Sequence, residues 1–127
     1  MADLRIQVGD RECTAEWVED SQSTRKAIEE ALPLEGKGRK WGGELYFRTG
    51  VDVEGENTRT ELPVGAIAYW PEGNAICLFW GKTPASRDDE PRAAAPVSIV
   101  ARITDMAALT TATDDVADGT RIRLTRS

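Results

Sequence analysis

The 127-residue chain contains no histidine and only two cysteines, Cys13 and Cys77. Ser-His-Asp triads and Cys–His pairs need an imidazole base, so both kinds of nucleophile system are excluded. The usual zinc sites, built from several histidine and cysteine ligands, are excluded as well, and we expect neither a metal nor a cofactor. Each cysteine lies in an apolar run, where a free thiol behaves as a small hydrophobic side chain. We therefore expect two buried thiols rather than a disulfide.

Positive charge and long apolar runs are also scarce. The chain has 16 basic and 22 acidic residues, a formal net charge of −6, and its basic residues form no stripe. Nucleic-acid affinity depends on such clusters, so we expect no nucleic-acid partner. No segment approaches the roughly 20 apolar residues of a membrane span, and the N-terminus lacks the apolar region of a signal peptide. These observations predict a cytoplasmic protein with no membrane partner.

The length and the apolar pattern predict one mainly β domain over residues 1–127. Residues 4–8 and 13–17 alternate between apolar and polar side chains, which is typical of an antiparallel hairpin with one face in the core. Residues 21–32 predict a helix that Ser23 caps and Pro33 ends, and a second short helix begins at Thr104 or Asp105. Further strands are predicted over residues 45–53, 62–70, 75–80, 97–103 and 120–125.

Two of these strands, 62–70 and 75–80, are almost continuously apolar, which is typical of strands covered on both faces. Along the second, Ile76 and Leu78 face one way while Cys77 and Phe79 face the other, so one pair fills the interior and the other lies under an outer cover. Seven or eight short strands favour a sandwich or a closed barrel. We prefer the barrel because closure removes the exposed edges of such hydrophobic strands.

Three segments are expected to be loops. Residues 35–40 are charged and contain glycines, and residues 54–59 form a polar connection. Residues 82–96 carry three prolines and few apolar side chains larger than alanine. A loop of that length inside a compact domain is unusual and is often functional.

Several stretches of the chain resemble a known family. They are W-G-G-E-L-Y-F at 41–47, A-Y-W-P-E-G-N-A-I-C-L-F-W-G-K-T-P at 68–84 followed by Ser86, and P-V-S-I-V-A-R-I at 96–103. They are similar to the small prokaryotic cyclophilin-like family, whose members have about this length and no characterised activity. The resemblance implies a closed antiparallel β-barrel of eight strands with two short helices, in agreement with the strand pattern.

Related peptidyl-prolyl isomerases use an arginine, a glutamine, aromatic side chains and a histidine, and this chain has no histidine. Tyr46-Phe47-Arg48 is similar to their Phe-His-Arg, which leaves Arg48 as the sole candidate for a catalytic arginine. Isomerisation of an X-Pro bond faces a barrier of about 18–20 kcal/mol, and an arginine beside an aromatic pocket lowers it by donating to the prolyl nitrogen. The alternative is that Tyr46 and Arg48 form an exposed pair on the barrel wall.

Aromatic side chains are few, but most of them gather in two segments, 41–47 and 69–80. Polar side chains lie close to them in sequence, and together they predict a ligand-binding groove lined by Trp41, Glu44, Tyr46, Tyr69, Phe79, Thr83 and Ser86. The alternatives are that the aromatic side chains pack in the core and that the hydroxyls close a turn.

Three functional hypotheses remain open. The first, which we prefer, is a cyclophilin-like protein that binds a peptide or small ligand in the aromatic groove. The second is an atypical peptidyl-prolyl isomerase that uses Arg48. The third is a homo-oligomeric interaction protein without a small-molecule site.

Overall fold

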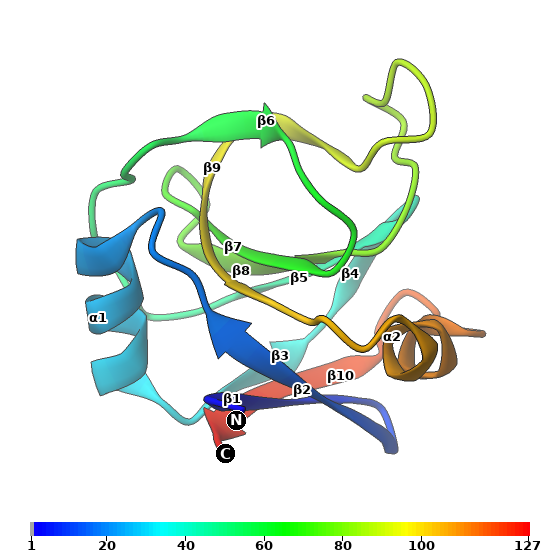
Figure 1. Ribbon diagram of the computed structural model, residues 1–127, viewed down its shortest axis with the longest axis horizontal. Helices are drawn as coiled ribbons and strands as arrows, with labels where there is room; N and C mark the ends of the chain where they lie inside the picture. Colours follow the sequence, from blue (N-terminus) through cyan, green and yellow to red (C-terminus); the bar gives the residue numbers. More distant parts are fainter. Residues whose placement is uncertain (1) are drawn as a thin grey trace.

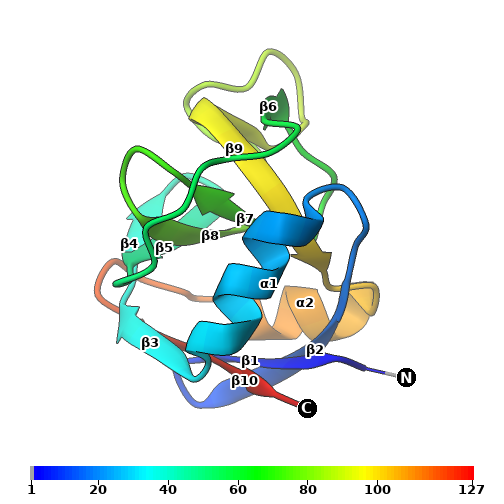
Figure 2. The same cartoon turned by 90° about the vertical axis from the view of Figure 1, so that its left-hand side faces the viewer.

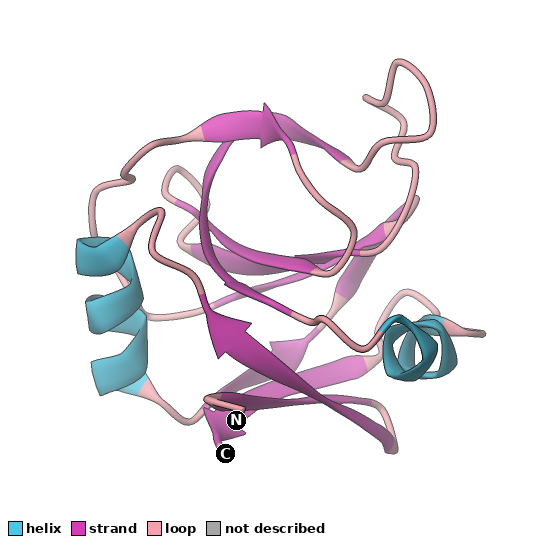
Figure 3. Ribbon diagram, in the orientation of Figure 1, coloured by secondary structure: helices cyan, strands magenta, loops and turns pink. Residues whose placement is uncertain are grey.

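The computed structural model describes residues 2–127. This part of the chain contains ten strands and two helices and is mainly β (Figure 3). In chain order the elements are β1 (Leu4–Val8), β2 (Arg11–Trp17), α1 (Gln22–Ala31), β3 (Leu34–Lys37), β4 (Arg39–Trp41), β5 (Glu44–Arg48), β6 (Arg59–Glu61), β7 (Ala66–Trp70), β8 (Ala75–Phe79), β9 (Arg92–Arg102), α2 (Met106–Thr113) and β10 (Arg121–Arg126).

The strands form one antiparallel sheet. Its hydrogen-bonded order is β3-β10-β1-β2-β9-β7-β8-β5-β4, and β6 pairs with β9 outside this path. The path has two ends, so the predicted closed barrel of eight strands is corrected to a ten-stranded sheet that is not closed by hydrogen bonds. The sheet is strongly curved, and its end strands β3 and β4 follow each other in the chain (Figure 1).

The two ends of the path meet at Gly38, where the chain changes its pairing partner. β3 pairs with β10 before this residue, and β4 pairs with β5 after it. The N–H of Gly38 donates to the carbonyl of Thr120 at 2.7 Å. A Cβ at position 38 would lie 2.7 Å from that oxygen and 2.8 Å from the Leu45 side chain. The prediction of a loop over residues 35–40 is therefore wrong, and glycine is needed here because two chain segments approach so closely.

The larger of two apolar clusters fills the inside of the curved sheet. The alternation predicted for β1 and β2 is confirmed, since their apolar side chains point into this cluster while the residues between them face solvent. We call it the inner cluster, and its buried members are Leu4, Ile6, Val8, Cys13, Ala15, Ile28, Leu45, Phe47, Val51, Ile67, Tyr69, Ile76, Leu78, Val100, Ala101, Ile103, Leu109, Ala112, Ile122 and Leu124.

A second apolar cluster lies on the opposite face of β7 and β8. The first half of β9 pairs with β6 and its second half pairs with β7. The long strand β9 therefore runs from β6 to the side of β7 (Figure 2). Strands β7 and β8 are therefore buried on both faces, as their continuous apolar runs predict. We call this the outer cluster; its buried members are Leu62, Ala66, Ala68, Cys77, Phe79, Ala93, Val97 and Ile99, and Val18, Tyr46 and Trp70 pack against it.

The two helices lie on opposite sides of the molecule (Figure 1). Helix α1 has Ser21 as its N-cap residue, not the predicted Ser23. The Glu56 carboxylate, from a distant loop, accepts the N–H of Thr24 at 2.8 Å and so satisfies a free donor of the first turn. Helix α2 begins as predicted, with the Asp105 carboxylate accepting the N–H of Ala108 at 3.0 Å.

Several predicted boundaries shift. The strand predicted over 45–53 ends at Arg48, and the strand predicted over 62–70 begins at Ala66. The predicted loop over 82–96 is shorter, because β9 begins at Arg92. Strand β6 was not predicted; its three residues pair with the early part of β9. Neither helix in residues 2–127 has the length and apolar character needed to cross a membrane.

Candidate functional site

A pocket of about 250 Å³ opens beside the outer cluster. It lies between the end of β4, the outer face of β5, β7 and β8, and the first half of β9. Its lining is mostly apolar and includes three aromatic rings and one carboxyl group: the residues are Trp41, Glu44, Tyr46, Trp70, Cys77, Ala93, Ala94, Ala95 and Val97.

Strand pairing places the polar and aromatic side chains of this pocket on one face. On β5, Glu44 and Tyr46 are two residues apart and therefore point to the same side of the sheet. Tyr46 lies opposite Cys77 of β8, and Glu44 lies opposite Trp41 of β4. Because directly opposite residues of antiparallel strands project to the same face, the four side chains meet on the side of the outer cluster.

The aromatic rings form two differently oriented walls. Tyr46 and Trp70 contact each other edge to face, with ring centroids 6.2 Å apart and planes at 90°. All three rings, including Trp41, are half-buried, so each keeps part of its surface accessible. The indole Nε1 of Trp70 is buried and has no hydrogen-bond partner among the described residues. A buried donor without a partner is costly.

The space in front of the rings exists because β9 begins with small side chains. Three consecutive alanines, 93–95, line the pocket together with Val97. Ala93 is buried in the outer cluster, whereas Ala94 is exposed and borders the pocket. Larger side chains in this run would fill the volume that the rings leave open.

Glu44 is the one acidic residue that lines the pocket, and only 6% of its surface is exposed. Burial disfavours the charged form and raises the pKa of this carboxyl to about 7, against a weaker lowering by a hydrogen bond with the Cys77 side chain. The pKa of the Cys77 thiol is itself raised well above its usual value, first by burial and then by the charge of Glu44. At neutral pH Glu44 is thus poised between its two protonation states.

Three of the seven residues predicted to line a groove do line this pocket: Trp41, Glu44 and Tyr46. Phe79 is fully buried in the outer cluster, opposite Glu44 in the pairing of β5 and β8. Tyr69 lies on the other face of β7, in the inner cluster. Its hydroxyl donates to the carbonyl of Val51 at 2.7 Å, so Tyr69 ties down the chain after β5 and does not line the pocket.

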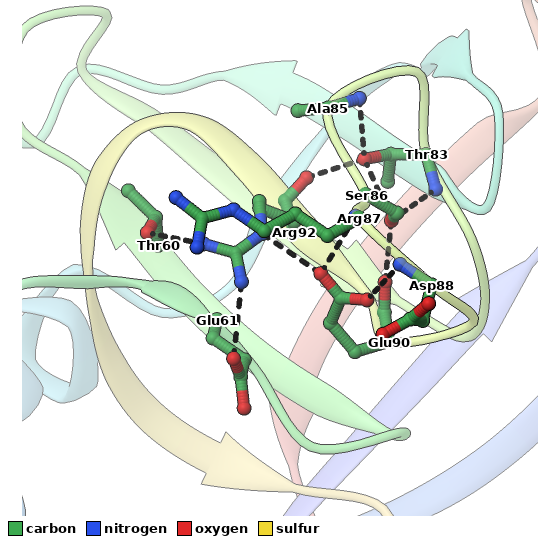
Figure 4. Close-up of polar contacts among 9 residues, drawn as sticks. All are labelled: Thr60, Glu61, Thr83, Ala85, Ser86, Arg87, Asp88, Glu90 and Arg92. Atoms are coloured by element: carbon green, nitrogen blue, oxygen red, sulfur yellow. Dashed lines mark hydrogen bonds and ion pairs between the residues drawn. The ribbon is translucent and has the colours of Figure 1, made fainter.

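Thr83 and Ser86, the other two predicted groove residues, organise the loop before β9 (Figure 4). The Thr83 hydroxyl donates to the carbonyl of Arg92 at 2.5 Å. The Ser86 hydroxyl accepts the N–H of Thr83 at 2.9 Å and donates to the carbonyl of Glu90. Both hydroxyls therefore close a turn, which is the alternative that the sequence left open.

Charged side chains hold the same loop against β6. The Glu90 carboxylate accepts the backbone N–H groups of Arg87 and Asp88 and the Nε of Arg92 (Figure 4). These hydrogen bonds to the charged form lower the pKa of Glu90 to about 2. The guanidinium of Arg92 also reaches the Glu61 carboxylate of β6 at 3.0 Å. The network fixes the start of β9, and with it the alanine side of the pocket.

Arg48, the candidate catalytic arginine, lies outside the pocket. Its guanidinium donates to the carbonyl of Gly73 at 3.2 Å. It borders a separate hollow together with Lys37, Arg39 and Tyr46. Tyr46 is the residue that the two hollows share.

The sequence did not identify six lining residues: Trp70, Cys77, Ala93, Ala94, Ala95 and Val97. For Trp70 and Cys77 a signal existed, because strand alternation places them on the face opposite Tyr69 and Leu78. The alanine run lay inside a predicted loop, so its orientation could not be deduced. Both cysteines are free and buried, as expected. Within residues 2–127 there is no group of three or more metal-ligating side chains that could hold an ion.

Comparison with known proteins identifies the family. The family model described as cyclophilin-like matches residues 2–125. The solution structure of the hypothetical protein AF2241 from Archaeoglobus fulgidus is 37% identical, with a TM-score of 0.79 over 99% of this chain and 95% of that one. A structure of McbB in complex with tryptophan is 14% identical, with a TM-score of 0.75 over 98% of this chain and 44% of that one, and this likeness shows the fold alone. No curated protein matches. The chain belongs to the cyclophilin-like family.

Proposed function

We propose that this protein binds a small organic ligand, or one side chain of a peptide, in the pocket between Trp41, Tyr46 and Trp70. The observation that carries the proposal is the combination of an open apolar hollow, three half-buried rings and one buried carboxyl. Small-molecule sites typically have such a largely apolar lining with a few convergent polar groups. A carboxyl whose pKa is strongly displaced by burial in a cleft is a further mark of a functional site.

The side chains around the pocket are also not completely packed. Well-packed interiors leave few voids, and nearly every buried donor in them has a partner. Here the rings remain half-buried and the Trp70 Nε1 has no partner among the described residues. An aromatic or aliphatic group seated against the rings would remove this apolar surface from water, which is the main favourable contribution to such binding.

A protein of the same fold, McbB, has been solved in complex with tryptophan. The matched region is 44% of that chain, so the complex supports the proposal as an example of a protein that contains this fold and binds a small aromatic molecule. The identity of 14% transfers neither the ligand nor its binding residues to this chain.

No feature of the pocket favours the prolyl isomerase hypothesis. A catalyst needs a donor directed at the prolyl nitrogen beside the apolar pocket, and Arg48 borders a different hollow. Catalysis by Arg48 stays a prediction, tested by the exchange rate of an X-Pro peptide with the wild-type protein and the Arg48→Ala variant. Assembly into homo-oligomers also stays a prediction, tested by sedimentation over a range of concentrations.

The proposal is tested by placing a larger side chain at an exposed position that lines the pocket. Ala94 is exposed and lines the pocket, so Ala94→Leu should block the volume without disturbing the core. Ala107 is also an exposed alanine, but it lies on α2 beside an unrelated hollow, so Ala107→Leu is the matched control. A library of small amines, acids, aromatic fragments and short peptides is screened by ligand-detected NMR against all three proteins.

We expect at least one compound that binds the wild-type protein and the Ala107→Leu control equally well and binds Ala94→Leu at least tenfold more weakly. The proposal fails if no compound binds, or if every compound that binds does so equally well to Ala94→Leu.

A further inference from the structure

We infer that the pocket selects organic ammonium cations. The Glu44 carboxylate is the counter-charge, and the rings of Trp41, Tyr46 and Trp70 contact the cation. This inference rests on the binding function proposed above and adds the class of ligand. The residues that line the pocket include one acidic side chain and no basic one. The charge available to a ligand is thus of a single sign.

The carboxylate of Glu44 has no cationic partner in the part of the chain that the structure describes. None of the ion pairs within the described residues involves Glu44. Its hydrogen-bond partner is the thiol of Cys77, and a thiol is a weak donor. A buried charge is stable only when it is paired and hydrogen-bonded. A cation from outside can therefore serve as its charge partner.

The aromatic walls favour a cation over other neutralising partners. The face of an indole or phenol ring attracts an ammonium group through its quadrupole, and tryptophan does so most strongly. Trp41 and Trp70 both line the pocket, and Tyr46 stands at a right angle to Trp70. An alkylammonium group also has apolar methyl or methylene surface that fits an apolar lining.

Two other classes of ligand fit the pocket less well. A hard metal ion prefers six or more oxygen ligands, and this lining offers one carboxyl group. An anion would meet the buried Glu44 without a basic side chain to offset it. The basic residues Lys37, Arg39 and Arg48 surround the neighbouring hollow instead.

The test uses two probes of the same shape. Choline carries a quaternary nitrogen where 3,3-dimethylbutan-1-ol carries a carbon, so the two differ in charge and little else. Dissociation constants are measured at pH 8 by NMR titration of the wild-type protein and of the Glu44→Gln, Cys77→Ala and Ala94→Leu variants. Circular dichroism checks that each variant is folded.

We expect choline to bind wild-type protein about tenfold or more tightly than the alcohol, as charge and ring attraction together imply. Glu44→Gln should bring the two affinities close to equality. Cys77→Ala alters the packing beside Glu44 but retains the carboxylate, so it should keep the preference for choline. This variant separates loss of the Glu44 charge from a change in packing.

A pH series adds a second readout. Besides Glu44, the pocket is lined by two titratable groups, Tyr46 on β5 and Cys77 on β8. The lining residues of β4 and β9 are a tryptophan, three alanines and a valine, which do not titrate. Choline itself does not titrate, and burial keeps the Cys77 thiol protonated. The affinity of the wild-type protein for choline should therefore rise between pH 6 and pH 8 as Glu44 loses its proton. This rise should be absent in Glu44→Gln.

The outcomes separate the two proposals. If both probes bind with equal affinity and Ala94→Leu blocks both, the pocket is a ligand site but the selectivity for cations is refuted. The same inference also fails if choline binds equally well to wild-type protein and Glu44→Gln, or if neither probe binds. Failure of the binding function itself is recognised separately, by a full compound library that yields no binder sensitive to Ala94→Leu.

Discussion

Replacing Glu44 with glutamine should change how the stability of the fold depends on pH, because the carboxyl is buried and has no cationic partner within residues 2–127. Burial raises its pKa from 4.5 to about 7. Between these values the folded protein keeps the proton that the unfolded chain has already released. The folded state thus binds more protons than the unfolded state, and the free energy of unfolding falls as the pH rises through this window.

The size of the effect follows from the pKa. Each pH unit between the unfolded and the folded pKa contributes about 1.4 kcal/mol. A rise from 4.5 to about 7 therefore corresponds to about 3 kcal/mol of stability that the wild-type protein lacks above pH 7 and regains below pH 4.5. Glutamine has nearly the same shape and does not ionise, so the Glu44→Gln variant does not have this dependence.

The assay is urea unfolding of both proteins at a series of pH values from 4 to 8.5. The free energy of unfolding of Glu44→Gln minus that of the wild type should increase by about 3 kcal/mol across the series, with most of the change between pH 4.5 and 7. Glu72→Gln, at an exposed position, is the matched control and should show no such change. A flat difference for Glu44→Gln, or one of opposite slope, would refute the assignment of Glu44 as a buried, uncompensated carboxyl.

Three further predictions concern packing, the loop before β9 and the thiols. Gly43→Ala should destabilise the fold by about 3 kcal/mol or more in urea unfolding, because a Cβ there would lie 2.4 Å from the backbone of Gly81. The control is Gly50→Ala, where a Cβ would have nothing within 4 Å, and it should cost less than about 0.5 kcal/mol. Equal costs for the two variants would contradict this prediction. Arg92→Gln should release the loop that its guanidinium holds and accelerate tryptic cleavage after the exposed Arg87 severalfold, and an unchanged cleavage rate would show that the network is dispensable. Both buried cysteines should resist a thiol reagent in the native protein and react fully in urea, so rapid native labelling would show that their surroundings open.

The elements that the sequence predicts well are those whose pattern is local. Strands β1, β2 and β8 carry their burial in their own alternation or in a continuous apolar run, and helix α2 carries its cap residue, Asp105. The prediction of two apolar faces on β8 is confirmed for the same reason: Ile76 and Leu78 lie in the inner cluster, and Cys77 and Phe79 lie in the outer one.

The elements that it misses are short strands defined by distant partners. β3, β4 and β6 have three or four residues each and no fully buried side chain. Their pairing depends on β10, β5 and β9, so nothing within 35–40 or 54–61 indicates a strand. β3 and β4 form the two ends of the sheet and β6 lies outside its main path, so the predicted closed barrel of eight strands omitted the strands at which the sheet ends.

The candidate site was predicted in part for a related reason. Trp41, Glu44 and Tyr46 follow from sequence proximity and from the common face of alternate residues on β5. The sequence gives the alternation along β7 but not which face lies inside, so it does not distinguish Tyr69 from Trp70 as a groove residue. The alanines of β9 reach the pocket through pairing with β6 and β7, and only the assembled sheet shows this.

The central claim is that ligands bind in the pocket lined by Trp41 and Trp70, and the four tryptophans of the chain provide an internal test. Trp17 and Trp80 lie elsewhere, packed against the inner cluster. The measurement is a two-dimensional ¹H–¹⁵N spectrum of the indole N–H groups, assigned by single Trp→Phe substitutions and recorded while a bound compound is titrated. We predict that the signals of Trp41 and Trp70 shift together while those of Trp17 and Trp80 stay in place; a ligand that shifts only the latter pair, or none of the four, would contradict the account.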